Sequence, residues 1–106
     1  MENIAISDLS NQKSLETSFS ELTERWRKET QMMSSITKKS KHPAYQEIIS
    51  MGTPVLPLIL RELKRQPDHW FWALVAISGE NPVSSESNFD RAVETWLEWG
   101  KNRGLI

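Results

Sequence analysis

PDHWFWALVAISGENP, residues 67 to 82, contains three consecutive aromatic side chains, Trp70, Phe71 and Trp72. On a helical wheel, the apolar residues of this stretch occupy nearly the whole circumference. Such a helix is typical of a central, buried element, and we therefore predict that Trp70 and Phe71 fill a core. The direction of Trp72 stays open, between covering the edge of the core and projecting from a surface.

Start and stop signals place helices around this stretch. Pro67-Asp68, with Asp68 as the cap, predicts the start of the aromatic helix, and Gly79 predicts its left-handed stop. Before it, Thr53-Pro54 predicts another helix start, and Pro57 is close enough to that start to be tolerated. The inner face of this preceding helix would be formed by Val55, Leu56, Ile59, Leu60 and Leu63.

After the aromatic helix, residues 79–88 are rich in turn formers and predict a loop. Ser87 or Asn88 would cap the last helix, which would end at Gly104. Its inner positions would be Ala92, Val93, Trp96, Leu97, Trp99 and Gly100.

The first half of the chain predicts a flexible arm over residues 1–13 and an amphipathic helix over residues 14–38. An apolar stripe marks this helix, although it lapses near Glu29 and Thr30. Residues 35–43 resemble a polar, basic linker, and Pro43 suits the first position of a short helix before Gly52. The stripe consists of Leu15, Phe19, Leu22, Trp26, Met33 and Ile36.

These elements predict an all-α fold, a compact bundle of about five helices with its core domain over residues 42–106. A length of 106 residues suits about one domain, and the absence of cysteine excludes disulfides and fits a cytoplasmic location. No apolar run is long enough for a membrane-spanning helix, and no signal peptide is evident. The net charge of -1 excludes a basic field over the whole domain.

The sequence predicts no catalytic residue, no metal site and no cofactor. The two histidines, His42 and His69, lack zinc-site spacing and are expected at the surface. Phosphate-binding glycine loops and a nucleophile elbow are also missing from the sequence. A small enzyme is the weakest hypothesis, and a deep polar pocket around Asp68, His69 and Glu80 would revive it.

One concentrated run of basic residues lies in the predicted linker. Together with the basic residues of a later helix, it could form a modest phosphate-binding face, although a solvated linker is the favoured interpretation of the run. Nucleic-acid binding is therefore the alternative function. The residues concerned are Lys38, Lys39, Lys41, Arg61, Lys64 and Arg65.

Residues 51–83, MGTPVLPLILRELKRQPDHWFWALVAISGENPV, resemble a HEAT-type helical pair. The phrases MG, LPLIL and WALVAI followed by Gly carry the resemblance. With HPAYQEII before this region and TWLEWGKNRG after it, the chain also resembles a group of small bacterial all-helical proteins. The resemblance implies a HEAT-like C-terminal helical core and a binding scaffold, and it implies no activity.

The favoured function is a non-catalytic protein–protein interaction module that binds another protein or a second copy of itself. An antitoxin-like or accessory subunit of a bacterial system is one concrete form. A stripe that extends to Met33 and Ile36 exceeds what one small core can cover, and exposed apolar strips mark partner sites. We expect no membrane partner. The predicted partner-binding residues are Trp26, Met33, Ile36, Trp72 and Trp99.

Overall fold

The computed structural model describes the backbone of residues 4–106 and the side chains of residues 15–106. The described chain is all-α, as predicted, with six α-helices and one 3-10 helix. None of these helices combines the length and the apolar character needed to cross a membrane. The elements are α1 (Ile4–Thr30), α2 (Ile36–Ser40), α3 (Pro43–Ser50), the 3-10 helix η1 (Thr53–Val55), α4 (Leu56–Arg65), α5 (Phe71–Ser78) and α6 (Phe89–Asn102).

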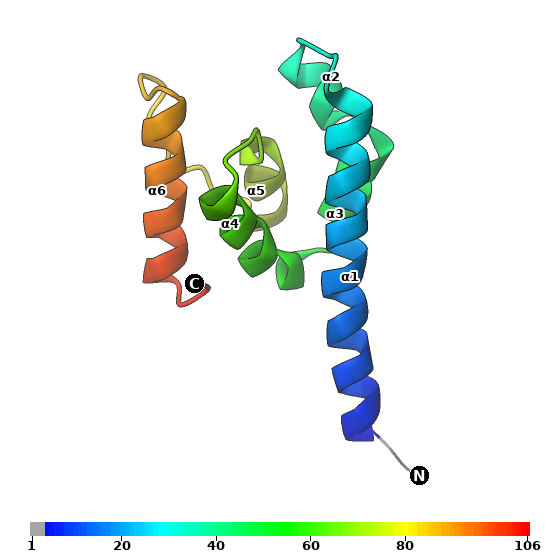
Figure 1. The fold of residues 1–106 in the computed structure, drawn as a ribbon. Helices are drawn as coiled ribbons and strands as arrows, with labels where there is room; N and C mark the ends of the chain where they lie inside the picture. Colours follow the sequence, from blue (N-terminus) through cyan, green and yellow to red (C-terminus); the bar gives the residue numbers. More distant parts are fainter. Residues whose placement is uncertain (1–3) are drawn as a thin grey trace. The chain divides into compact units, whose positions relative to one another are not determined.

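The chain forms two compact units, Met1–Ile48 and Ile49–Ile106. The second unit therefore begins within α3, at Ile49, seven residues after the predicted start of the core domain at residue 42. Aromatic packing explains the shift, because the Tyr45 ring of α3 lies 5.2 Å from the Trp26 ring of α1. Both side chains are buried, so the beginning of α3 belongs with α1 (Figure 1).

Helix α1 differs from the predicted helix at both ends. It begins at Ile4 instead of residue 14, and no glycine or proline interrupts residues 4–13. It ends at Thr30 instead of residue 38. The Thr30 hydroxyl donates to the Trp26 carbonyl at 2.6 Å, and the Met33 N–H donates to the Thr30 carbonyl at 2.9 Å. Met33 therefore lies in a connection, and residues 1–3 of the predicted flexible arm are outside the described range.

Helix α2 lies in the stretch that the sequence predicted to be a linker. Ser35 caps it, since its side chain accepts the N–H of Lys38 at 3.2 Å. The helix has five residues, none of them buried, and so it has no apolar stripe that a sequence pattern could detect. Its attachment to α1 comes instead from the indole of Trp26, which donates to the Lys39 carbonyl at 2.8 Å.

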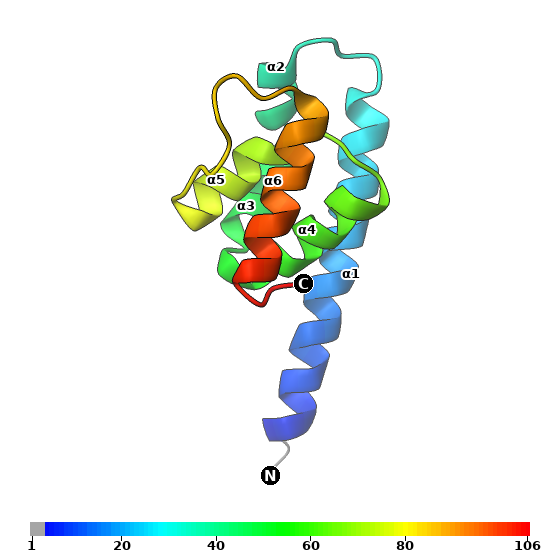
Figure 2. The same ribbon diagram turned by 90° about the vertical axis from the view of Figure 1, so that its left-hand side faces the viewer.

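In the second unit, α4 is the central helix and packs against both α5 and α6 (Figure 2). Its buried side chains are those predicted from the sequence, together with the buried Val55 of η1. Thr53 is the first residue of η1 and not a cap, because Gly52 precedes η1 with a positive φ of 78°. Asn88, one of the two predicted caps, caps α6, because its side chain accepts the Arg91 N–H at 2.8 Å. The buried residues of α6 are Ala92, Trp96, Trp99 and Gly100.

Helix α5 begins later than predicted. The carboxylate of Asp68 accepts the N–H of His69 at 2.7 Å, so it closes a turn before the helix and does not cap it. Trp70 is the capping residue, without a side-chain capping bond, and its side chain is fully buried as predicted. The predicted stop at Gly79 is confirmed, with a φ of 75° and an N–H bond to the Val75 carbonyl. Phe71 is only partly buried, which departs from the core assignment.

Candidate interaction surfaces

His69 before α5, Phe71 and Trp72 on α5 and Phe89 at the beginning of α6 are all at least partly exposed, and we call these four residues together the aromatic surface. Ala73 and Leu74 form the buried side of α5. The side chain of Trp72 is 57% exposed, which settles its direction towards solvent. All residues of α5 from Phe71 to Ile77 are apolar, so no charged side chain of the helix solvates this side.

Ring contacts join three residues of the aromatic surface, namely His69, Phe71 and Phe89. The Phe71 and Phe89 rings lie 5.4 Å apart at 64°, and the His69 ring lies 5.2 Å from Phe89 at 72°. Edge-to-face pairs of this kind contribute about 0.5–1.5 kcal/mol beyond the area they bury. They join the beginning of α5 to the first residue of α6, so the backbone that carries Trp72 is fixed at this end.

A second contact group holds the other end of α5. Glu80 accepts the indole N–H of Trp99 at 3.3 Å and forms an ion pair with Arg103, whose guanidinium lies 4.9 Å from the Trp99 ring centroid. The hydrogen bond from Arg103, followed by the one from Trp99, lowers the pKa of Glu80, and the same hydrogen bond raises the pKa of Arg103. These contacts fasten the residue after the Gly79 stop to the end of α6.

The enzyme hypothesis required Asp68, His69 and Glu80 to line one polar pocket. The structure engages Glu80 with Trp99 and Arg103, whereas His69 packs by its ring against phenylalanines. Among the described residues, no group of three His, Cys, Asp or Glu side chains could hold a metal ion.

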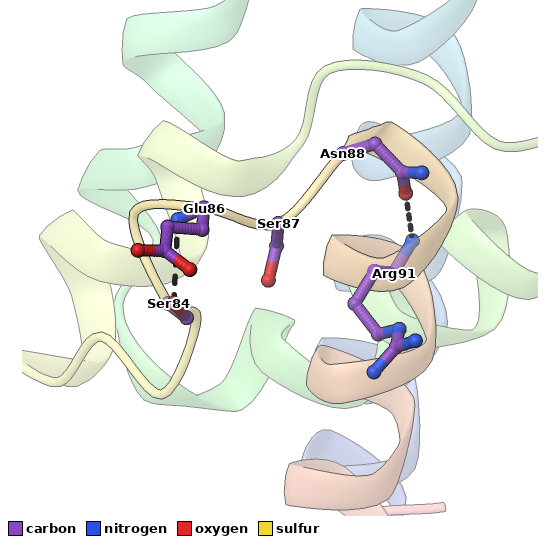
Figure 3. A pocket seen from close by; sticks show the side chains of 5 residues that line it. All are labelled: Ser84, Glu86, Ser87, Asn88 and Arg91. Carbon is purple, nitrogen blue, oxygen red and sulfur yellow. Dashed lines mark hydrogen bonds between the residues drawn. The ribbon is translucent and has the colours of Figure 1, made fainter.

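A polar hollow of about 300 Å³ lies where the α5–α6 loop enters α6 (Figure 3). Two of its polar side chains form hydrogen bonds within the loop and at the beginning of α6: Ser84 accepts the Glu86 N–H at 3.2 Å, and Asn88 caps α6. Glu86 and Arg91 are exposed. The lining offers a carboxylate, hydroxyls and a guanidinium, which suits weak polar contacts at the rim of an interface. Its lining residues are Ser84, Glu86, Ser87, Asn88 and Arg91.

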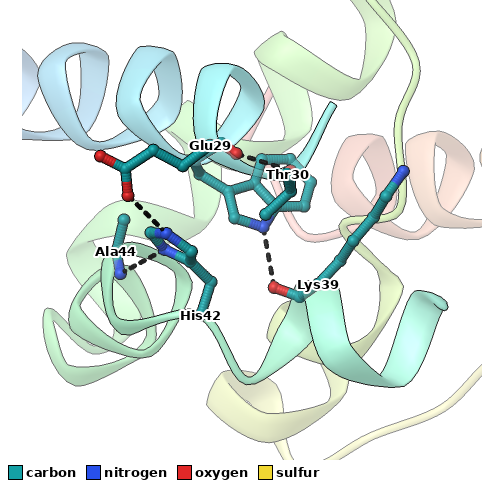
Figure 4. Close-up of polar contacts among 6 residues, drawn as sticks. Glu29, Thr30, Lys39, His42 and Ala44 are labelled. Atoms are coloured by element: carbon teal, nitrogen blue, oxygen red, sulfur yellow. Dashed lines mark hydrogen bonds and ion pairs between the residues drawn. The ribbon is translucent and has the colours of Figure 1, made fainter. Parts of the chain in front are cut away.

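The other histidine belongs to the first unit (Figure 4). His42 Nδ1 accepts the N–H of Ala44 at 3.0 Å, so His42 caps the beginning of α3. Its Nε2 lies 2.7 Å from Glu29 Oε1 and donates to it, because the other ring nitrogen is the acceptor. The Nε2 bond joins α1 to the beginning of α3 and the Nδ1 bond caps α3, so both ring nitrogens are engaged and neither is available as a general base in this state.

The structure separates the predicted partner-binding residues into two groups. Trp26 is 1% exposed and Trp99 is 8% exposed, so these two are core residues and their prediction as surface contacts was wrong. The Trp72, Met33 and Ile36 side chains are exposed. Both tryptophans fall on the inner stripe of their helices, and this pattern indicates core more strongly than surface.

Sequence reasoning missed the most exposed large apolar side chain among residues 15–106. Met32 is 91% exposed and lies in the connection between α1 and α2, beside Met33. No helical stripe includes it, because α1 has already ended. The signal in the sequence was the pair of consecutive methionines, Met32 and Met33, within a polar stretch.

The six basic residues of the nucleic-acid alternative belong to different units. Lys38, Lys39 and Lys41 lie on or directly after α2 in the first unit, whereas the other three lie on α4 in the second. On α4, Arg65 forms a bidentate ion pair with Glu62, in which Nη2 donates to Oε2 at 2.7 Å and Nε donates to Oε1 at 3.1 Å. The remaining two, Arg61 and Lys64, are exposed.

Comparison of the chain with family models, with curated proteins and with solved structures finds no match. The resemblance to a HEAT-type pair therefore stays a sequence-based expectation. The candidate site rests on the geometry of the chain's own residues, and the aromatic surface is the part of that geometry with the clearest functional chemistry.

Proposed function

We propose that the chain is a non-catalytic protein–protein interaction module that binds its partner through the aromatic surface. The observation that carries the proposal is Trp72, whose large side chain is 57% exposed on a helix with no charged residue. An antitoxin-like or accessory subunit of a bacterial system is the concrete form that we favour.

The energetics of binding favour this assignment. Tryptophan is the side chain most enriched among interface residues that contribute about 2 kcal/mol or more. The rings of Phe71 and Phe89 are held by each other and by His69, so they lose little conformational freedom when a partner binds. The polar groups of the neighbouring hollow, including Arg91, suit the wet rim that surrounds such a centre.

The chemistry of the partner follows from the surface. An apolar helix or groove with aromatic or aliphatic side chains would cover Trp72 and the exposed Ala76, which lie one turn apart on α5. Asp90 and Glu86 near Phe89 favour basic residues at the partner's rim.

A crosslinking experiment tests the proposal. A photoreactive amino acid replaces Trp72 in one variant and Glu98, which is exposed on α6, in a matched control. We expect a discrete crosslinked protein in cells from position 72 only, and we expect Trp72→Ala to abolish its co-purification while the melting temperature stays unchanged. Equal crosslinking from both positions, or co-purification that survives Trp72→Ala, would contradict the proposal. A crosslinked product of twice the chain mass would identify the partner as a second copy.

A further inference from the structure

A second exposed apolar cluster lies in the first unit, and its chemistry differs from that of the aromatic surface. Met32 is 91% exposed, Met33 is 38% exposed and Ile36 is 54% exposed. The three lie within five residues of chain, across the connection from α1 to α2. We call this cluster, together with the exposed lysines around it, the α1–α2 tip: Lys28, Met32, Met33, Ile36, Lys38 and Lys41.

The tip concentrates positive charge in an acidic chain. Residues 28–42 contain four lysines and one glutamate, and that glutamate, Glu29, is paired with His42. The rest of the chain has nine basic and thirteen acidic side chains, so the tip is a positive region in a chain with a net charge of -1. An anionic surface is therefore the complementary one.

The tip is held in place by the fold. The Trp26 indole donates to the Lys39 carbonyl (Figure 4). The Ser35 side chain caps α2. The turn after α1 is closed by the Met33 N–H bond to Thr30. The exposed apolar side chains are consequently presented by an ordered backbone, and binding through them costs little additional backbone entropy.

We propose that the α1–α2 tip docks on an anionic lipid surface, with Met32, Met33 and Ile36 entering the headgroup region and the lysines contacting lipid phosphates. Lysine is depleted at protein–protein interfaces, whereas clustered lysines beside apolar side chains are the pattern of lipid-surface contacts. Lysine stems extend along the apolar layer while their ammonium groups stay with the headgroups. The expectation of no membrane partner rested on the lack of a spanning helix, which has no bearing on surface docking.

Vesicle binding tests this proposal with the full chain. We expect sedimentation with vesicles of phosphatidylcholine mixed with phosphatidylserine, weaker binding at high salt, and no binding to phosphatidylcholine alone. Lys38→Glu with Lys41→Glu should weaken binding at least about 25-fold, since each lysine near an anionic membrane contributes roughly fivefold. Arg61→Glu with Lys64→Glu changes the net charge equally in the second unit and serves as the matched control, which should bind as the unmodified chain does.

A second variant tests the contribution of the apolar side chains to vesicle binding. Met32→Ser with Ile36→Ser should weaken vesicle binding at least about tenfold, because these side chains would otherwise leave water on docking. Both are exposed, so the melting temperature should stay unchanged. Absence of binding to anionic vesicles would overturn the proposal. Binding of duplex DNA that is lost with the lysine variant and retained with the Met32, Ile36 variant, without vesicle binding, would assign the tip to nucleic acid instead.

Discussion

Gly100 of α6 lies against Leu60 of α4, and Gly100→Ala tests how tightly the second unit is packed. A Cβ at this position would lie 2.6 Å from Leu60 Cδ1 and 3.3 Å from Ile106 Cγ1. The first distance is about 1 Å shorter than an ordinary carbon–carbon contact. Leu60 is fully buried, so its side chain has no open solvent into which it could move.

Two opposing effects decide the sign of the change. Alanine is favoured over glycine within a helix by about 1 kcal/mol. Inserting a methyl group into a packed core costs about 1–3 kcal/mol. Because the new methyl group of Gly100→Ala meets Leu60 on one side and Ile106 on another, we expect the packing cost to exceed the helix gain. The expected net loss is about 1 kcal/mol in the free energy of unfolding.

Urea unfolding followed by far-UV circular dichroism measures this loss, and a double-mutant cycle assigns its cause. Leu60→Ala alone should cost about 2–5 kcal/mol. In the Leu60→Ala background the 2.6 Å contact is absent and the 3.3 Å contact with Ile106 remains, so Gly100→Ala should be clearly less destabilising there than in the unmodified chain. An equal loss in both backgrounds, or a stabilising Gly100→Ala in the unmodified chain, would refute the close packing of α6 on α4.

Three further changes test the contacts that hold each unit. Trp26→Phe should cost about 1 kcal/mol more in unfolding free energy than Trp96→Phe. Both rings are buried, but within the described side chains only the Trp26 indole, of these two, forms a hydrogen bond. Urea unfolding of both variants measures the difference. The pKa of Glu80 is lowered in the folded chain, so the ionised carboxylate stabilises the fold above the ordinary pKa of 4.5, and this stabilisation is lost as the pH falls below 4.5. In Glu80→Gln the melting temperature should therefore depend less on pH over this acidic range. His42→Ala removes the cap of α3 and should cost about 1 kcal/mol, whereas His42→Asn retains a capping side chain and should cost less, as thermal unfolding of the two variants would show.

The features that the sequence predicted correctly are determined by nearby residues. Gly79 ends α5 because a left-handed residue is needed after the last turn, and Asn88 begins α6 because its side chain reaches an N–H three residues on. The stripe of α4 identifies its buried face for the same reason, since a period of 3.6 residues reports burial directly. Such signals need no knowledge of the rest of the fold.

The features that the sequence could not give depend on partners distant in the chain or on competing local bonds. Asp68 has the residue type of a cap, but its carboxylate is engaged by the neighbouring His69 N–H. Helix α2 has no buried residue and is attached through an indole thirteen positions away. The exposure of Met32 follows from the end of α1 at Thr30, which is marked by the Thr30 hydroxyl bond to the Trp26 carbonyl and by the Met33 N–H bond to the Thr30 carbonyl.

The contacts that hold the two exposed apolar clusters explain why these clusters differ from incidental surface residues. In the second unit, α5 is fixed at one end by the Phe71–Phe89 rings and at the other by the Glu80 ion pair. In the first unit, the hydrogen bond from the Trp26 indole to the Lys39 carbonyl attaches α2, which carries Ile36 and Lys38 of the tip, to α1. Exposed apolar side chains are unfavourably hydrated in the free chain. When their backbone is already ordered, binding a partner costs little additional backbone entropy. Trp26→Phe should therefore weaken vesicle binding although Trp26 itself is buried, whereas Trp96→Phe, in the other unit, should leave vesicle binding unchanged.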